Sequence, residues 1–369
     1  MDKVLIVSGT SIISGAEIVL KDYLENTKNI SSFDILCSDI NEIKEFYNKV
    51  LKNRVISCKE ITPTMAIKDR YSLSSKLKKI LRFVNFFRVV KSVNLKHKYD
   101  IIWANNTGDI IYSIFFKKMY KRKFIINIHD IVKRNSLMGK VVRVFDRYVD
   151  KYIAVSNSVK EALVRLGISE NKIYIVYNGM IIENTDNDFQ FKKKETISKI
   201  GFVGSLIERK DPLTFVEFIR KTKLNGYMVY NHYDTSLYNK IKTVIEEERL
   251  NIDLIGKLDR GDIDKFMKEM DFLFIPSLQD PLPTVVLESF KNYTPCIGRN
   301  IDGIPEMITE DYNGYLFNND DDLNLISLKI ANISSEKYNQ LRKNSHITVT
   351  NKFNIKVKVN KIDEILFVD

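Results

Sequence analysis

Short apolar runs alternate with longer amphipathic segments along the whole chain. This alternation is typical of parallel β-sheets whose strands are joined by crossover helices. In the first half the pattern predicts helices at Gly15–Asn26, Ser136–Val149 and Ser158–Leu166, set between seven short strands. The predicted strands of this half are Val4–Ser8, Phe33–Ser38, Arg54–Cys58, Asp100–Ala104, Phe124–His129, Tyr152–Ser156 and Ile173–Tyr177.

A polar run, Ile182–Glu195, separates this half from a second half with the same rhythm. The run is rich in Asn, Asp and Lys and has little periodicity, which is typical of a linker. A length of 369 residues also favours two domains over one. We expect domains at 1–181 and 198–351, a linker at 182–197, and at 352–369 a terminal helix that returns to the first domain. The predicted strands of the second half are Ser198–Val203, Tyr227–Asn231, Ile252–Ile255, Asp271–Pro276, Pro295–Gly298 and Gly314–Phe317.

Composition indicates two globular domains in a reducing compartment. The chain is 44% hydrophobic, and none of its apolar stretches approaches the ~20 residues of a membrane-spanning helix. Asp2 and Lys3 precede an apolar run that predicts a first strand and not a signal peptide. The three cysteines are far apart and give neither a disulfide framework nor a zinc spacing, which fits a cytoplasmic protein.

The net excess of positive charge lies in the first half. Residues 1–180 contain 32 Lys and Arg against 17 Asp and Glu, a net +15, and the remainder contains 26 against 30, a net −4. Such a basic half indicates an acidic partner, which is a nucleic acid, an anionic membrane or a phosphorylated substrate.

The segment Lys68–Lys98 holds ten of these bases and one acid, Asp69. Its apolar residues recur at helical spacing, so it reads either as a helix on a membrane surface or as a core-facing helix with a solvated basic back. The candidate contacts to a membrane or an acceptor are Lys76, Lys78, Lys79, Arg82 and Arg88.

The sequence DFLFIPSLQDPLPTVVLE, Asp271–Glu288, places a turn between a predicted strand and a predicted helix. Ligands of open α/β sheets bind at the carboxyl ends of strands, where helix amides are free. Asp280 is suited to sugar hydroxyls and Glu288, one turn beyond Thr284, to a ribose. The alternative makes Asp280 a helix cap and Glu288 a solvated carboxylate. The amides expected to face a ligand are those of Leu282, Thr284 and Val285.

A second motif, GFVGSLIERKDP, follows the same plan. The predicted strand ends at Gly204–Ser205, where glycine lets the backbone approach a ligand, and Arg209 and Lys210 follow in the loop. These two cations can neutralise a diphosphate, although a pair of this kind is usually only solvated charge. Asp211 is expected to cap a helix that has Pro212 at its first position.

Two weaker features lie in the first half. Ser11–Glu17, SIISGAE, follows the first strand and lets the backbone at Gly15 approach a ligand, but it is not GxGxxG and does not indicate a dinucleotide site. His129 ends a predicted strand and suits polar contacts or proton transfer, although a lone histidine there is more often structural.

Taken in order, these motifs resemble the family 4 retaining glycosyltransferases. The similarity extends over roughly Val4–Phe317, and Asp280 and Glu288 have the spacing of the family's two carboxylates. The matching positions are Gly15–Glu17, His129, AVS at 154–156, YNG at 177–179, GSLIERK at 204–210, PSLQDPLPTVVLE at 276–288, GIPE at 303–306 and NGYLF at 313–317.

The resemblance implies the GT-B fold, with two doubly wound Rossmann-like α/β domains facing each other across a cleft. It implies that Arg209 and Lys210 bind the donor diphosphate, that Asp280 touches the transferred sugar and that Glu288 binds the ribose. Gly15 would approach the phosphates, and His129 would lie beside the sugar or the acceptor. It further implies retention of the anomeric configuration, without a protein nucleophile, a metal or another cofactor.

The sequence departs from the family pattern at three places. Ser14 replaces the first glycine before Gly15, Ser205 stands where many members have arginine, and YNHYD at 230–234 replaces a glycine-rich turn. The last change leaves recognition of the base open. Asp262 and Asp264 imitate a DxD metal motif, but we interpret Asp262 as a helix cap and assign no metal.

We therefore expect a retaining hexosyltransferase that uses a nucleotide-diphosphate sugar, most readily a UDP-sugar, and extends a lipid-linked bacterial surface glycan. It would be a cytoplasmic protein attached to the anionic inner face of the plasma membrane, without a nucleic-acid partner. One alternative is a GT-B enzyme that is not a transferase, such as a sugar-nucleotide epimerase. Another is a basic nucleic-acid-binding module, although the basic segment lacks interleaved stacking aromatics.

Overall fold

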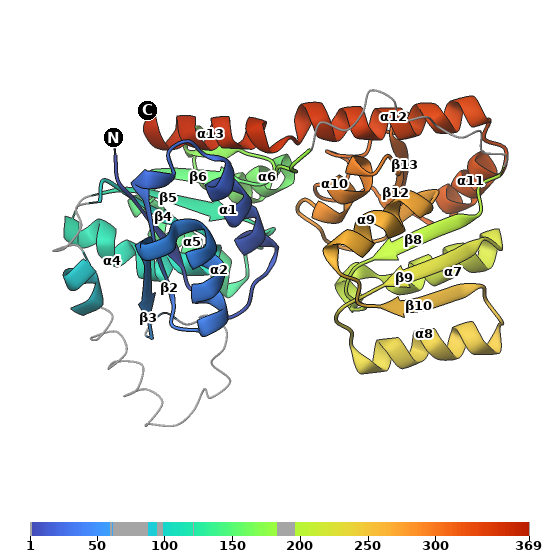
Figure 1. Ribbon diagram of the computed structural model, residues 1–369, viewed down its shortest axis with the longest axis horizontal. Helices are drawn as coiled ribbons and strands as arrows, with labels where there is room; N and C mark the ends of the chain where they lie inside the picture. The colour runs from blue at the N-terminus through green and yellow to red at the C-terminus, as the bar shows by residue number, and fades with distance from the viewer. Residues whose placement is uncertain are drawn as a thin grey trace. The chain divides into compact units, whose positions relative to one another are not determined.

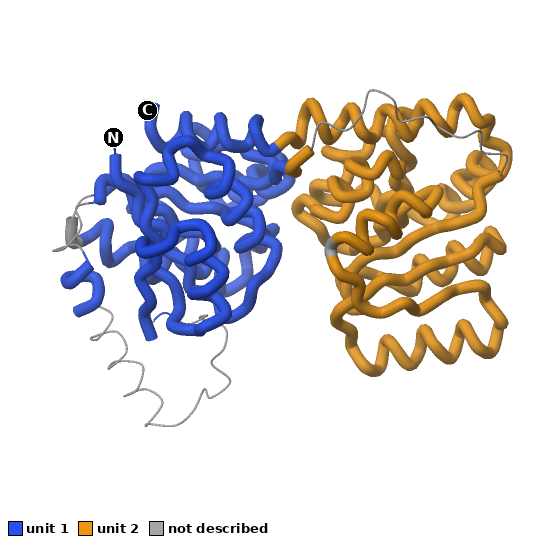
Figure 2. Tube along the Cα trace, in the orientation of Figure 1, with its two compact units in different colours: residues 1–179, 355–369 blue, residues 180–354 orange. Residues whose placement is uncertain are grey.

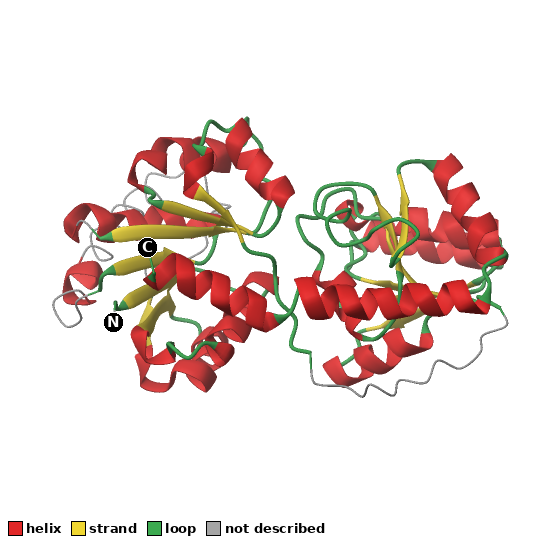
Figure 3. Cartoon of the chain, turned by 90° about the horizontal axis from the view of Figure 1, so that it is seen from above, coloured by secondary structure: helices red, strands yellow, loops and turns green. Residues whose placement is uncertain are grey.

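The computed structural model describes residues 2–59, 61, 88–93, 99–120, 122–182 and 196–368. The chain forms two compact units (Figures 1 and 2). The first comprises Met1–Gly179 together with Ile355–Asp369, and the second comprises Met180–Asn354. Each unit contains one parallel sheet with helices on both faces (Figure 3).

The described part of the first unit has a seven-stranded sheet of order β3-β2-β1-β4-β5-β6-β7. All five residues of β1 are buried, because helices cover both faces of a parallel sheet. The strands are β1 (Val4–Ser8), β2 (Phe33–Ser38), β3 (Val55–Cys58), β4 (Ile101–Ala104), β5 (Lys123–Ile128), β6 (Lys151–Ala154) and β7 (Ile173–Ile175). The helices are α1 (Gly15–Asn26), α2 (Asn41–Leu51), α4 (Ile110–Tyr120), α5 (Leu137–Phe145), α6 (Asn157–Arg165) and α13 (Ile355–Phe367).

The second unit has a six-stranded parallel sheet of order β10-β9-β8-β11-β12-β13 among its described residues. Its core contains a row of aromatic rings in which Phe274 stacks on Phe218 and Phe317, with ring centroids 4.8 Å and 5.4 Å apart. The strands are β8 (Lys199–Val203), β9 (Asn225–Val229), β10 (Ile252–Gly256), β11 (Phe272–Ile275), β12 (Cys296–Arg299) and β13 (Gly314–Phe317). The helices are α7 (Pro212–Thr222), α8 (Thr235–Glu247), α9 (Arg260–Glu269), α10 (Thr284–Lys291), α11 (Asp320–Ala331) and α12 (Ser335–Lys352).

Each of the thirteen predicted strands is present, with ends within two residues of the predicted ones. Helix α1 has the predicted bounds, and α5 ends at Phe145 and continues as a short 3-10 helix, Asp146–Tyr148. The C-terminal helix begins at Ile355, three residues after the predicted start, because α12 occupies the chain as far as Lys352.

The C-terminal helix α13 completes the core of the first unit. Its residues Val359 and Ile362 join the cluster that contains Tyr23 and Trp103, and these two rings meet edge to face at 5.4 Å. Tyr23 donates a 2.5 Å hydrogen bond to Asp363 of α13. The first unit is therefore built from both ends of the chain.

Lys358 is an ionisable residue of α13 that lies inside this core. Its side chain is buried, and its ammonium donates a 2.5 Å hydrogen bond to the carbonyl of Val19 in α1. Burial lowers the pKa of Lys358 from 10.5 to about 7, although the negative charge of Asp22 acts in the opposite direction. The folded state therefore disfavours the ammonium form that the unfolded chain prefers.

This burial predicts a pH-dependent stability. Below pH 7 both states hold the proton and the folded protein carries the full cost of burying the charge. Between about pH 7 and 10.5 the unfolded chain holds one proton more, so stability rises with pH by up to ~1.4 kcal/mol per pH unit. We expect Lys358→Met to stabilise the protein most at pH 7 and least near pH 10. Urea unfolding at pH 7, 8.5 and 10 measures this, with the exposed Lys361→Met as control, and equal effects of both variants at every pH would contradict it.

Candidate donor and acceptor sites

Both candidate sites lie where the order of strands reverses. In the first sheet β1 is flanked by β2 and β4, and in the second sheet β8 is flanked by β9 and β11. Connections on the two sides of such a reversal diverge, and the hollow at the carboxyl ends of these strands is where open α/β sheets bind ligands. The motifs chosen from sequence follow β1, β5, β8 and β11.

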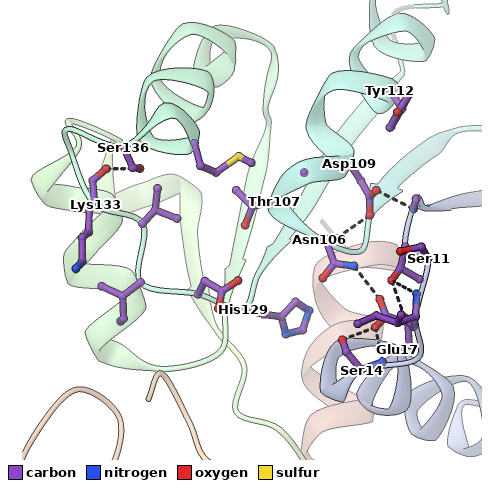
Figure 4. Close-up of a pocket in the computed structure, with 18 residues that line it drawn as sticks. Ser11, Ser14, Glu17, Asn106, Thr107, Asp109, Tyr112, His129, Lys133 and Ser136 are labelled. Carbon is purple, nitrogen blue, oxygen red and sulfur yellow. Dashed lines mark hydrogen bonds between the residues drawn. The ribbon is translucent and has the colours of Figure 1, made fainter. Parts of the chain in front are cut away.

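A cavity of about 560 Å³ opens at the reversal in the first unit (Figure 4). It is lined by residues of three segments, each running from the end of a strand into the following helix: 9–17 after β1, 106–112 after β4 and 129–138 after β5. The predicted residue His129 lines it, whereas Gly15 does not and lies exposed at the start of α1. Its walls carry hydroxyl, amide, imidazole and carboxyl groups.

Glu17 joins two of these segments. The side chain is fully buried, and one carboxylate oxygen accepts from the amide and hydroxyl of Ser14, at 3.0 and 2.5 Å. The other oxygen accepts from the side-chain amide of Asn106, at 2.9 Å (Figure 4). Ser14, the residue that departs from the family pattern, therefore supplies a hydroxyl that a glycine cannot.

Asp109 was not predicted from sequence, although it ends the polar run Asn105–Asp109 directly after β4. Its carboxylate accepts from the amides of Gly9, at 2.8 Å, and Asn106, at 3.1 Å. Burial raises the pKa of Asp109 to about 7. A side chain at Gly9 would place its Cβ 2.7 Å from this carboxylate, so the loop requires glycine there.

His129 is neutral in this setting. Burial and the positive charge of Lys358 lower the pKa of His129 to about 4, although a hydrogen bond with the backbone of Asn105 acts to raise it. Its Nε2 is buried and has no hydrogen-bond partner among the described residues. The imidazole is therefore uncharged at pH 7, with one ring nitrogen unpaired in the described part of the chain.

The predicted donor residues come together in the second unit. The ammonium of Lys210, after β8, lies 2.5 Å from the carboxylate of Asp280, after β11. Arg209 donates to the carbonyl of Gln279 at 3.0 Å, and its own carbonyl accepts from the amide of Leu278 at 2.9 Å. Three contacts thus join loops that are 70 residues apart in sequence.

Asp280 does not cap α10, so that alternative reading is wrong. Its carboxylate meets Lys210 and, at 3.5 Å, the hydroxyl of Ser277. Its amide donates to Asp302 at 3.0 Å, and its carbonyl accepts from Gly303 at 3.1 Å. A Cβ at Gly303 would fall 1.8 Å from the carbonyl oxygen of Pro281, which explains the glycine of the GIPE motif.

The start of α10 offers backbone donors beside this ion pair. Pro283 takes the N-cap position, and the amides of Leu282, Thr284 and Val285 have no acceptor within residues 196–368. Glu288 is half-buried in the second turn of the helix. The half-buried Ser205 accepts a 3.0 Å hydrogen bond from Ile207 through its carbonyl.

Arg299 is a residue of the candidate donor region that sequence reasoning missed. Its guanidinium donates to the carboxylate of Asp211 at 2.6 Å and to the carbonyl of Pro276 at 2.9 Å, so it joins both donor loops. Asp211 has a left-handed backbone with φ of 47°. Its carboxylate accepts from Thr214 Oγ1 and Arg299 and not from a helix amide, so the prediction of a side-chain cap is wrong.

The remaining sequence candidates do not add to either site. Lys76, Lys78, Lys79 and Arg82 lie outside the described residues, and Arg88 is exposed. Asp262 lies within the first turn of α9 and pairs with Lys265 at 3.4 Å. The N-cap of α9 is Asp259, so the prediction that Asp262 caps this helix is wrong. The described part of the chain contains no cluster of His, Cys, Asp and Glu able to hold a metal ion.

The contacts of Arg299 predict a measurable effect on stability. In Arg299→Ala the half-buried carboxylate of Asp211 loses its charged partner and the left-handed turn loses its support, which should lower the free energy of unfolding by roughly 1.5–3 kcal/mol. Arg220→Ala breaks more exposed ion pairs with Glu217 on α7 and with Glu248, the C-cap of α8, and should cost at most about 1 kcal/mol. Urea denaturation compares the two, and an equal or larger loss in Arg220→Ala would refute the assignment.

Comparison with known families covers most of the chain. Residues 61–184 match the family described as Glycosyltransferase Family 4, and residues 183–347 match the family described as Glycosyl transferases group 1. Together the two matches take in strands β4–β7 of the first sheet and the whole of the second sheet, including its reversal point.

Curated relatives and solved structures agree. An uncharacterised glycosyltransferase of Methanocaldococcus jannaschii is 24% identical over 336 residues, covering 87% of this chain and 85% of the relative. The UDP-Gal:alpha-D-GlcNAc-diphosphoundecaprenol alpha-1,3-galactosyltransferase of Escherichia coli is 25% identical over 386 residues, covering 97% and 94%. The structure of Anabaena HepE in complex with UDP superposes with a TM-score of 0.81 at 17% identity, covering both chains completely.

The two family matches and the two parallel Rossmann-like sheets lead to one assignment: the chain belongs to the family 4 glycosyltransferases of GT-B fold.

Proposed function

We propose that this glycosyltransferase is a retaining, metal-independent hexosyltransferase. It moves a sugar from a UDP-sugar to a lipid-linked bacterial surface glycan at the cytoplasmic face of the plasma membrane. The observation that carries the proposal is the 2.5 Å contact between Lys210 and Asp280, with Arg209 beside it, at the strand-order reversal of the second sheet.

This arrangement suits departure of a nucleotide diphosphate. Lys210 is 20% exposed and Asp280 is 7% exposed, so the cation is held but can be reached by a ligand. A donor diphosphate would compete with Asp280 for the ammonium, while Arg209 and the unpaired amides at the start of α10 add donors. Fixed positive groups of this kind stabilise charge that grows on the leaving phosphate.

Asp280 and Glu288 would bind the neutral parts of the donor. Once the ammonium of Lys210 binds the donor phosphate in place of Asp280, the carboxylate of Asp280 can accept hydrogen bonds from hydroxyls of the transferred sugar. Glu288, in the second turn of α10, would accept from the ribose, and Ser205 would let the donor approach the backbone after β8. Retention without a protein nucleophile then requires the leaving phosphate itself to guide the incoming hydroxyl.

The cavity in the first unit is the proposed acceptor site. Its volume of about 560 Å³ exceeds that of a single sugar, and its lining offers both acceptors and donors of hydrogen bonds. The unpaired Nε2 of His129 is suited to a sugar hydroxyl because the ring is neutral at pH 7. The carboxylate of Asp109 lies in the same lining.

The relatives support the donor and the acceptor. The Escherichia coli relative is named for a UDP-galactose donor and a diphosphoundecaprenol acceptor, and HepE is solved with UDP. The excess of bases in residues 1–180 suits an anionic membrane, and Lys76, Lys78, Lys79, Arg82 and Arg88 remain candidates for that contact. None of the helices in the described ranges is long and apolar enough to cross a bilayer.

The whole proposal is tested in one assay. The protein is incubated with UDP-galactose, UDP-glucose or UDP-N-acetylglucosamine, with and without N-acetylglucosaminyl-diphosphoundecaprenol, in excess EDTA. We expect UDP release only with acceptor present, and an α-linked product by NMR from one of these α-linked donors. Release without acceptor would favour the epimerase-type alternative. Loss of turnover in EDTA that magnesium or manganese restores would overturn metal independence, and a β-linked product would overturn retention.

The roles of Arg209 and Lys210 predict a loss in turnover. Charge on the leaving phosphate grows in the transition state, so Arg209→Ala and Lys210→Ala should lower kcat on the order of 100- to 1000-fold and affect donor affinity less. Lys240→Ala, an exposed lysine of α8, serves as control. Lys210→Ala leaves the carboxylate of Asp280 without its charged partner. The double variant Lys210→Ala with Asp280→Asn is therefore measured as well, to separate a loss of folding from a loss of turnover. Near-normal kcat in both single variants would place the phosphate site elsewhere.

A further inference from the structure

Helix α5 presents large apolar side chains to solvent. Leu137 is 69% exposed and Val144 is 62% exposed, although both lie in a well-formed helix. Seven residues correspond to two helical turns, so both side chains project from the same face, with the exposed Lys140 between them. The opposite side is buried through Gly139 and Val142, and a Cβ at Gly139 would fall 2.3 Å from the carbonyl oxygen of Lys133.

All charged residues of α5 and the loop before it are basic. Residues 131–145 contain four basic residues and no acid. All four are exposed, and they form no ion pair with any residue that the structure describes. Elsewhere on this unit Lys44, Lys117 and Lys172 each pair with an aspartate. The unpaired basic residues are Lys133, Arg134, Lys140 and Arg143.

This surface adjoins the cavity of the first unit. Lys133 and Ser136, in the loop that precedes α5, and Met138, in its first turn, line the cavity (Figure 4). A molecule bound to the exposed face of α5 is therefore beside the proposed acceptor site. Exposed apolar residues interspersed with unpaired cations suit a layer of anionic headgroups over an apolar interior.

We propose that α5 and the loop before it dock on an anionic lipid surface, with Leu137 and Val144 inserted among the headgroups and the four basic residues bound to lipid phosphates. This rests on the proposed lipid-linked acceptor, which the docked helix would bring to the cavity at its first turn. A lipid surface offers phosphates at every position, so it can bind all four basic residues. A protein partner would instead need acidic groups placed to match them.

The test is co-sedimentation of the full chain with vesicles of phosphatidylcholine alone and with 30% phosphatidylglycerol. Two variants address the surface, Leu137→Ser with Val144→Ser, and Lys140→Glu with Arg143→Glu. The matched control is Leu325→Ser with Leu328→Ser on α11, whose side chains are 60% and 61% exposed and whose first turn holds three aspartates. We expect each α5 variant to lose at least about tenfold in affinity for the anionic vesicles, and the control to bind like the wild type.

Three results would overturn the proposal: α5 variants that bind like the wild type, an α11 control that loses as much, or a wild type without preference for anionic vesicles. If transfer to the detergent-solubilised acceptor proceeds in any of these cases, the proposed function stands and only the docking surface fails. A stable dimer of the wild type that the α5 substitutions disrupt would assign the face to a second copy and would also overturn the proposal.

A second measurement does not depend on affinity. Trp103 is the chain's one tryptophan and is fully buried, so Leu137→Trp adds a single reporter at the surface. Its emission should shift to the blue with anionic vesicles, whereas Leu325→Trp should not respond. A red, unshifted emission at position 137 in vesicle-bound protein would exclude insertion of this helix.

Discussion

The reversal of strand order beside β1 and beside β8 is the constraint on which both sites depend. It leaves a hollow between loops that belong to neighbouring strands, and something must hold those loops together. In each unit a carboxylate takes part in this. Glu17, after β1, accepts from Asn106, after β4. Asp280, after β11, accepts from Lys210, after β8.

The two bridges differ in what a ligand can do to them. Glu17 is surrounded by donors from its own unit, so exchanging any of them for a ligand gains little. Asp280 instead holds a cation, and an incoming diphosphate is a stronger partner for that cation than a lone carboxylate. One bridge therefore fixes the shape of a loop, and the other keeps a charge in place until a donor arrives.

Most of the fold and part of the site were predictable from sequence. Strands that are buried on both faces appear in the sequence as short apolar runs. Pro212 indicates the start of a helix whether or not the residue is buried. Arg209, Lys210 and Asp280 were found because their motif spacing is local. Arg299 was missed because its importance depends on two distant groups, the carbonyl of Pro276 and the carboxylate of Asp211, that only the folded sheet brings to it.

Buried ionisable groups were equally hidden. Asp109 and Lys358 look like surface residues in the sequence, because nothing in their local pattern reports that both are buried in the fold. Asp211 holds the predicted N-cap position of α7, with Pro212 at the helix start, but its carboxylate bonds no helix amide because a partner 88 residues away takes it.

The return of α13 to the first unit has a consequence for synthesis on the ribosome. The core of the first unit contains Ile355, Val359 and Ile362, so it stays incomplete until these residues, which follow the second unit in the sequence, have left the exit tunnel. The second unit is continuous, from Met180 to Asn354, and all of its sequence emerges earlier. The second unit can therefore close first, while the sheet of the first unit waits, with apolar surface uncovered, for a helix that is translated after the whole second unit.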